Sequence, residues 1–283
     1  MANEAGKTWT RLTVTNHDRD QAGLTYVYPV LSRRSGGISV GINLNPNQAC
    51  NYRCIYCQVP NLTRGVAPSI DLDLFEHELD GFLHAQGASN ASTPPIQDVA
   101  FSGDGEPTTC KRFDEVVARL GLVLDRHGLL GTLPVVVISN GTMMDRPEVQ
   151  RGLQAIAAMK GELWFKIDGG SEARRRLIND SRVGDEKLLD LLETAARCCP
   201  VRIQSCMFKL DGQEPSPQDC EDYLAVLEAA RERGIALRGI SLYGIARESH
   251  QPEATRLSRL SQAWFDHFAE EIEARGFSVR VHR

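Results

Sequence analysis

Hydrophobic and polar positions divide the chain into alternating strand and helix segments. Near-continuous apolar runs such as Val135-Val136-Val137-Ile138 are typical of strands that are covered on both faces of a parallel sheet. Strands are predicted at residues 38–44, 99–102, 134–139, 162–168, 201–208, 236–243 and 277–281. Apolar residues at helical spacing predict helices at 70–86, 113–127, 147–159, 186–197, 218–233 and 253–275.

This alternation predicts an α/β fold. Parallel neighbouring strands need crossover helices, and those crossovers are right-handed, so strand–helix units in series favour one curved parallel sheet. Six units fall short of the eight that close a full barrel, so we expect a partial (β/α)6 TIM-like barrel. We expect a single domain over 1–283, with a leader at 1–37, a core at 38–275 and a short strand at 276–283. Its chemistry should gather at the C-terminal ends of the strands.

Charge and composition narrow the function classes. Lys and Arg number 32 against 37 Asp and Glu, a net charge of −5, which argues against a nucleic-acid partner held by general electrostatics. The chain shows neither a membrane-length apolar run nor a secretory signal, so we expect a cytoplasmic protein without a membrane partner. Its eight cysteines should therefore stay reduced, and reduced thiols suggest metal binding or catalysis.

Three of these cysteines form a tight motif. Cys50, Cys54 and Cys57 follow the first predicted strand in a loop rich in Pro and Asn, so one loop can wrap three thiolates around a metal centre. A structural zinc site usually has four protein ligands, and no further Cys or His follows closely before His77, within a predicted helix. Three soft ligands point instead to an iron–sulfur cluster with one iron left open.

A Cys-x3-Cys-x2-Cys motif after the first strand of an α/β barrel resembles the radical SAM enzymes. The resemblance implies that Cys50, Cys54 and Cys57 hold one 4Fe–4S cluster, whose open iron binds S-adenosylmethionine (SAM). It also implies that the reduced cluster cleaves SAM, usually to a 5′-deoxyadenosyl radical. The electron would come from a reductase or a flavodoxin-type donor. The implied activity is that of an enzyme whose cofactors carry the difficult chemistry.

Other residues match this family at the ends of later strands. Gly103, Asp104, Gly105 and Glu106 resemble its glycine-rich loop beside the SAM amino group, with Asp104 in place of the usual second glycine. Glycines let the backbone approach a ligand closely, and Glu106 adds negative charge. The resemblance also suggests the following residues for cofactor binding: Tyr56, Ser139, Asn140, Lys166, Gln204, Tyr243 and Arg247.

Each of these residues also has a structural alternative. Ser139 and Asn140 could form a turn, Tyr56 could pack in the core, and Arg247 could lie in solvent. Lys166 is costly to bury among apolar neighbours without an anion, so it either reaches solvent or meets a carboxylate. Cys206 could meet the substrate or a thiophilic atom such as arsenic, or could be an inert buried thiol. Lys166 and Cys206 are the candidate catalytic residues.

The sequence does not determine the substrate. The leading hypothesis is radical chemistry on a small-molecule substrate. Residues 29–37 resemble a segment of the wybutosine-forming tRNA enzymes, which makes tRNA-base modification the alternative, although the net charge opposes it. Transfer of the aminocarboxypropyl group of SAM to an acceptor is a third hypothesis. A non-catalytic metal-binding module is a fourth, but it does not explain the glycine-rich loop.

Overall fold

A curved, mostly parallel sheet forms the centre of the computed structural model, which describes residues 23–32, 37–87 and 94–282. Its strand order is β1-β2-β5-β6-β7-β8-β10-β12. The strands are β1 (Val27–Ser32), β2 (Gly37–Ile42), β5 (Ile96–Phe101), β6 (Val135–Ser139), β7 (Glu162–Lys166), β8 (Val201–Cys206), β10 (Leu237–Tyr243) and β12 (Val279–His282). All neighbours from β2 to β12 are parallel, and β1 runs antiparallel to β2. In the described residues β1 and β12 are the two edges, so the predicted open, curved sheet is confirmed.

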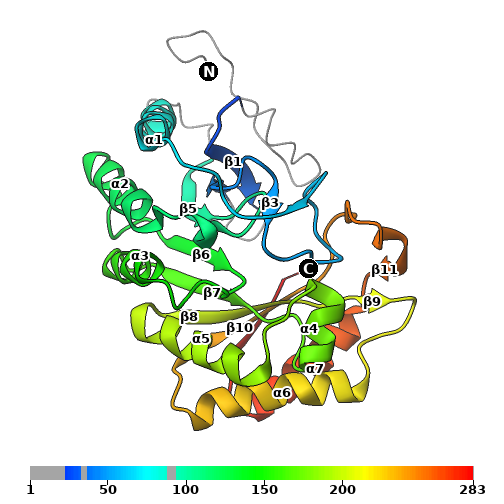
Figure 1. Ribbon diagram of the computed structural model, residues 1–283. Helices are drawn as coiled ribbons and strands as arrows, with labels where there is room; N and C mark the ends of the chain where they lie inside the picture. Colours follow the sequence, from blue (N-terminus) through cyan, green and yellow to red (C-terminus); the bar gives the residue numbers. More distant parts are fainter. Residues whose placement is uncertain (1–22, 33–36, 88–93, 283) are drawn as a thin grey trace.

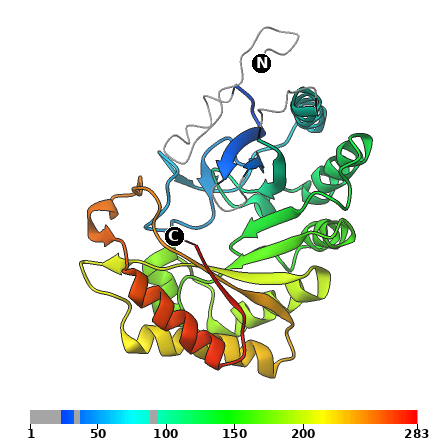
Figure 2. The same ribbon diagram turned by 180° about the vertical axis from the view of Figure 1, so that it is seen from behind.

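Helices cover the outer face of this sheet (Figures 1 and 2). Neighbouring helices pack against each other in the order α1, α2, α3, α5 and α6. They are α1 (Leu72–Gly87), α2 (Phe113–Arg126), α3 (Pro147–Ala158), α5 (Asp185–Cys198) and α6 (Pro217–Glu232), with α7 (Gln262–Ala274) beside β12. In the described part of the chain, no helix has both the length and the apolar character needed to cross a bilayer.

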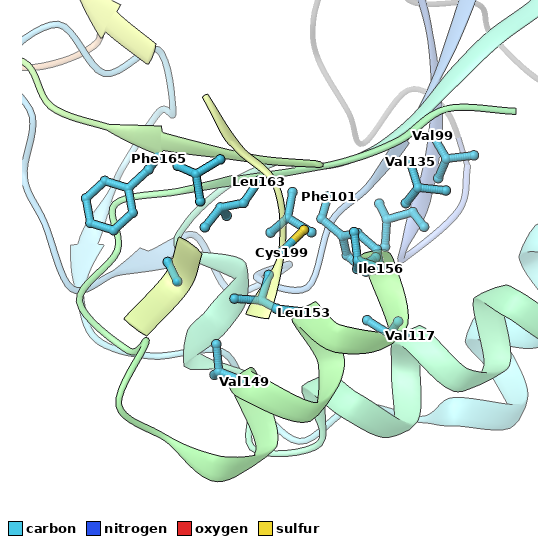
Figure 3. Packing of buried hydrophobic residues seen from close by; sticks show 14 of the residues in the cluster. Val99, Phe101, Val117, Val135, Val149, Leu153, Ile156, Leu163, Phe165 and Cys199 are labelled. Atoms are coloured by element: carbon cyan, nitrogen blue, oxygen red, sulfur yellow. The ribbon is translucent and has the colours of Figure 1, made fainter. Parts of the chain in front are cut away.

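The core lies between the sheet and these helices. Phe101, Val135 and Leu163 from the strands meet Val117, Leu153 and Ile156 from α2 and α3, as Figure 3 shows. All six side chains are completely buried. The apolar residues of a covered strand run nearly without interruption, as in β6 (Val-Val-Val-Ile-Ser), where four of the five residues are buried.

Two parts of the chain differ from the sequence prediction. The helix predicted at 253–275 is wrong in its first third: it begins at Gln262, where Ser261 caps it by accepting a hydrogen bond from Trp264 N. The preceding residues form a turn and a short strand, β11 (Leu257–Ser258), which pairs with β9 (Lys209–Leu210). The second difference is α4 (Glu172–Asn179), a helix that was not predicted and that follows β7.

Part of the predicted leader also belongs to the sheet. The edge strand β1 is stabilised by Glu78 of α1, whose carboxylate accepts hydrogen bonds from the backbone N–H groups of Thr25 (2.7 Å), Tyr26 (2.8 Å) and Val27 (3.3 Å). Glu78 is buried, and these bonds explain how α1 tolerates a charge on its core-facing side. Of the segment 29–37, residues 33–36 lie outside the described residues, so its resemblance stays a prediction.

Replacing Glu78 should therefore weaken the N-terminal edge of the sheet. We expect Glu78→Ala to lower the free energy of unfolding by about 1–3 kcal/mol, because it leaves buried N–H donors without an acceptor. Urea denaturation measures this change. The neighbouring residue His77 is the control, and His77→Ala should stay within about 0.5 kcal/mol. Equal losses for the two variants would contradict the role given to Glu78.

Candidate functional site

A cavity of ≈ 360 Å³ opens at the C-terminal ends of the strands. The end of β5 contributes the glycine-rich loop, β6 contributes Asn140, β7 contributes Lys166, and the loop after β10 contributes Arg247. The loop between β3 (Ala49–Cys50) and β4 (Thr63–Arg64) forms another wall. Of the predicted site residues, the cavity is lined by Cys50, Cys54, Tyr56, Cys57, Gly103, Asp104, Gly105, Glu106, Asn140, Lys166, Gln204, Cys206, Tyr243 and Arg247.

The cysteine loop is held on one side by α4. The backbone N–H groups of Arg53 and Ile55 donate to the carbonyls of Asn179 (3.1 Å) and Ile178 (2.8 Å), at the last residues of that helix. Cys54 lies between these two anchors, so its position is fixed by the backbone. An inner turn, in which Cys57 N donates to Cys54 O at 2.9 Å, fixes the third cysteine relative to the second.

A segment after β10 holds the same loop on its other side. Ser249 Oγ donates to the carbonyls of Ile55 (2.8 Å) and Cys57 (3.0 Å), and His250 N donates to Cys57 O at 2.9 Å. Arg53 forms a two-pronged ion pair with Glu253, with N–O distances of 2.9 and 2.8 Å. The sequence pattern did not reveal this segment, because residues from 253 onward were predicted as part of a helix.

Cys50, Cys54 and Cys57 are not joined in disulfides, and each is only partly exposed. Burial raises the pKa of the Cys54 thiol to about 12, and burial also raises the pKa of the Cys50 thiol. A metal that binds these sulfurs must therefore displace their protons, which a cationic centre does readily.

The donor set bears on the kind of metal centre. Among the described residues, no group of three or more His, Cys, Asp or Glu side chains is placed to hold a single metal ion. In an iron–sulfur cluster, different cysteine thiolates bind different iron atoms. Cys50, Cys54 and Cys57 all line one cavity, a donor set that fits a cluster.

Close packing explains the two glycines of the loop after β5. Gly103 has φ +146°, and a Cβ there would lie 2.5 Å from Asn43 Oδ1. A Cβ on Gly105 would lie 2.1 Å from the carbonyl oxygen of Ala49, beside Cys50. Gly103 thus lets the loop approach Asn43 at the end of β2, and Gly105 lets it approach the cysteine segment, where a side chain would separate the two.

Asp104, the departure from the family pattern, has its own partner. Asn43 Nδ2 donates to Asp104 Oδ2 at 2.6 Å, and Asp104 N donates to Asn43 Oδ1 at 3.1 Å. Asn43 directly follows β2 and is buried. It was not predicted as a site residue, although its position after the first strand was a usable signal.

Glu106 is engaged by the protein itself. Its buried carboxylate accepts from Ser139 Oγ (2.7 Å) and Asn140 N (2.7 Å), and also from the backbone N–H and the hydroxyl of Thr108. Burial raises the pKa of Glu106, and these hydrogen bonds oppose the rise. Ser139 is not one of the residues that line the cavity, and its hydroxyl donates to Glu106, so its role in cofactor binding stays a prediction.

Lys166 meets a carboxylate, one of the two outcomes expected for it. Its Nζ donates to Tyr243 Oη at 2.6 Å and lies 3.5 Å from Asp168 Oδ1. The ammonium also sits 5.2 Å from the centre of the Tyr56 ring, within cation–π distance. Burial lowers the pKa of Lys166, but the negative charge of Asp168 together with the other groups around the ammonium outweighs burial, so the pKa is raised. Lys166 is thus an ammonium in the cavity wall.

Asp168 was not predicted as a site residue, yet it connects several of them. Its carboxylate accepts from Cys206 N (2.8 Å), from Asn179 Nδ2 (2.8 Å), from the hydroxyl of Tyr56 and from Lys166. Its position two residues after β7 was the available signal, since polar residues at strand ends face the site in this fold class.

The inner face of β8 is now defined. Gln204 and Cys206 line the cavity, whereas Ser205 faces outward and shares a 2.8 Å hydrogen bond with Tyr223. Gln204 is 4% exposed, and no described residue forms a hydrogen bond with its side-chain amide.

Arg247 Nη1 donates to Gln58 Oε1 at 2.9 Å, which connects the loop after β10 to the end of the cysteine motif.

Comparison with known proteins identifies the family. The sequence profile of the radical SAM superfamily matches residues 44–256. The chain belongs to the radical SAM superfamily. This result confirms the resemblance carried by the cysteine motif and identifies the protein as an enzyme of the superfamily. Membership implies that the chain uses SAM and an iron–sulfur cluster.

Individual relatives of this radical SAM chain are distant. A UPF0026 protein of Helicobacter pylori is 31% identical over 137 residues, which is 48% of this chain and 41% of that protein. The UPF0026 protein MJ1312 of Methanocaldococcus jannaschii is 29% identical over 152 residues, 53% of this chain and 42% of that protein. This chain therefore spans about two fifths of these curated relatives.

Solved radical SAM structures share the fold. A radical SAM methyltransferase from Sphaerobacter thermophilus matches with a TM-score of 0.61 at 15% identity, covering 90% of this chain and 68% of that chain. TYW1 with a bound lysine–pyruvate adduct matches with a TM-score of 0.53 at 16% identity, covering 83% of this chain and 73% of the TYW1 chain. Both likenesses concern the fold, and they agree with a curved sheet that does not close.

The ion pair between Lys166 and Asp168 in this radical SAM cavity can be tested by substitution. We expect Asp168→Ala to lower the free energy of unfolding by about 3–5 kcal/mol, because it leaves a buried ammonium without its counter-charge. Adding Lys166→Met in the same chain should recover part of that loss. Urea denaturation of anaerobically purified protein with matched metal content measures both. No recovery in the double variant would contradict the charge pairing.

Proposed function

We propose that this chain is a radical SAM enzyme that binds one 4Fe–4S cluster through Cys50, Cys54 and Cys57 and acts on a small-molecule substrate. The observation that carries the proposal is the single cavity that brings together three thiols, a glycine-rich loop and a polar inner strand face. When bound, the cluster would supply the electron that breaks a carbon–sulfur bond of SAM. The chain's own residues position the reactants and exclude water.

Different parts of the cavity suit different parts of SAM. The glycine-rich loop packs at Gly105 against Ala49, next to the first cysteine, so it would border a nucleotide held at the cysteines. Backbone carbonyls there can accept from the SAM ammonium. Asn140 and Arg247 also lie on the wall and offer donors to hydroxyl or carboxylate oxygens.

Lys166, Gln204 and Cys206 form the inner side of the cavity and are our candidates for substrate contact. Lys166 provides a positive charge and Gln204 provides an unengaged amide, a pair that suits a small substrate with a carboxylate or a similar anion. Cys206 is 2% exposed and is the candidate for direct contact with the reacting atom.

Modification of a tRNA base is the second candidate function, and the fold likeness to TYW1 favours it. TYW1 was solved with a lysine–pyruvate adduct bound, and in this chain Lys166 is a lysine that lines the cavity. The net charge of −5 opposes a large nucleic-acid partner. A salt-dependent gel shift with bulk tRNA separates this function from chemistry on a small molecule.

Cluster loading tests the metal assignment. After anaerobic reconstitution we expect about four irons and four sulfides per chain, with loss of the cluster in Cys50→Ala, Cys54→Ala and Cys57→Ala. Cys198→Ala is the matched control, because Cys198 ends α5 at the opposite end of the sheet, and it should retain full iron. Colourless protein with stoichiometric zinc would refute the proposal.

Product analysis tests the chemistry. With a strong reductant and SAM, the loaded protein should release 5′-deoxyadenosine, which chromatography separates from methylthioadenosine. Methylthioadenosine as the main product would instead indicate transfer of the aminocarboxypropyl group to an acceptor, with cleavage on the methionine side of the sulfur. Absence of both products from protein with a full cluster would contradict SAM cleavage.

A further inference from the structure

One side chain that the sequence pattern did not reveal contacts a sulfur of the cysteine motif directly. Asn179, the last residue of α4, donates from Nδ2 to Cys54 Sγ at 3.2 Å. The same nitrogen donates to Asp168 Oδ2 at 2.8 Å. An amide nitrogen carries two hydrogens, so each contact can use one of them.

The orientation of this amide is fixed by the chemistry of its partners. Ionised Asp168 only accepts hydrogen bonds, so the amide oxygen of Asn179 cannot face it without repulsion. Asp168 itself is held by Cys206 N at 2.8 Å and by the hydroxyl of Tyr56. The carboxylate therefore keeps an N–H of Asn179 directed at the sulfur.

The position of Cys54 beside Asn179 does not depend on the side-chain amide of Asn179. The backbone bonds of Arg53 and Ile55 to the end of α4 place Cys54 beside residue 179 whatever its side chain. At Cys50, in contrast, Sγ accepts from the backbone N–H of Tyr52 at 3.4 Å, a contact that no side-chain substitution removes. Asn179 thus donates a hydrogen bond to sulfur, and its side chain can be replaced while the backbone bonds keep the loop in place.

We propose that Asn179 is a positioning residue that raises the reduction potential of the cluster by donating a hydrogen bond to the Cys54 thiolate, with Asp168 holding its amide in place. The inference rests on the proposed function, since it requires a cluster on Cys54. Reduction adds negative charge to the cluster and its sulfurs, so an N–H donor stabilises the reduced state more than the oxidised state. Hydrogen bonds to sulfur are among the factors that set these potentials.

A redox titration followed by EPR tests this inference on reconstituted full-length protein. Asn179→Leu keeps a side chain of similar size and removes both donors. We expect its iron and sulfide content to match the unsubstituted protein. Its ratio of reduced to oxidised cluster at a fixed solution potential should fall about tenfold, which corresponds to about 59 mV for one electron.

Ser181→Ala is the matched control. Ser181 Oγ contacts Tyr52 Oη at 2.9 Å, so this variant perturbs the same loop without removing a hydrogen-bond donor to sulfur, and the reduction potential of its cluster should not change.

An unchanged potential in fully loaded Asn179→Leu would overturn the inference. If Asn179→Leu does not retain iron, Asn179→Ala is titrated in its place. Loss of iron in both, with full loading of Ser181→Ala, would also overturn it by making Asn179 a structural requirement. Failure of the unsubstituted protein to bind iron would instead refute the proposed function.

Discussion

The arrangement of the site depends on one buried carboxylate, Asp168. It lies between β7 and α4 and accepts hydrogen bonds from β8, from α4 and from the cysteine loop, while Lys166 supplies the counter-charge. A buried charge is tolerated only when it is paired and hydrogen-bonded. Each of these partners is therefore positioned by its hydrogen bond or ion pair with the same carboxylate. The consequence is a cavity in which one carboxylate connects the cysteine loop to α4 and to β8.

A second constraint is the attachment of the cysteine loop, which has almost no regular secondary structure of its own. Two segments hold it: the end of α4 through backbone bonds, and residues 249–253 through Ser249, His250 and Glu253. Both segments lie in connections after strands, where insertions do not disturb the sheet. The thiols are thus positioned by residues that are distant in sequence, and the flexibility of a Pro- and Asn-rich loop is removed by tertiary contacts.

Most of the sheet and helices could be predicted from sequence because each element carries its own local pattern. The valine run of β6 and the apolar spacing of α2 need no tertiary information. The cysteine spacing is similarly local, so the motif and its family could be recognised. The prediction for residues 253–275 failed because apolar spacing continues across Ser261, whose capping bond to Trp264 starts the helix later. α4 was missed because its mostly polar sequence leaves few apolar positions to count.

The side-chain pairs of the site could not be predicted, because they connect residues far apart in the chain. Asn43 pairs with Asp104, Tyr56 with Asp168, and Asn179 with Cys54, across 61, 112 and 125 residues. The sequence indicates that a polar residue stands at a strand end, but not whether it faces a ligand or another side chain. Glu106 shows the difference: its role at SAM stays a prediction, whereas the structure shows that four donors of the protein surround its carboxylate. A carboxylate satisfied in this way fixes the end of β6 beside the glycine-rich loop. That loop in turn lies against Ala49, beside the first cysteine, at Gly105, where a side chain would collide with the Ala49 carbonyl oxygen.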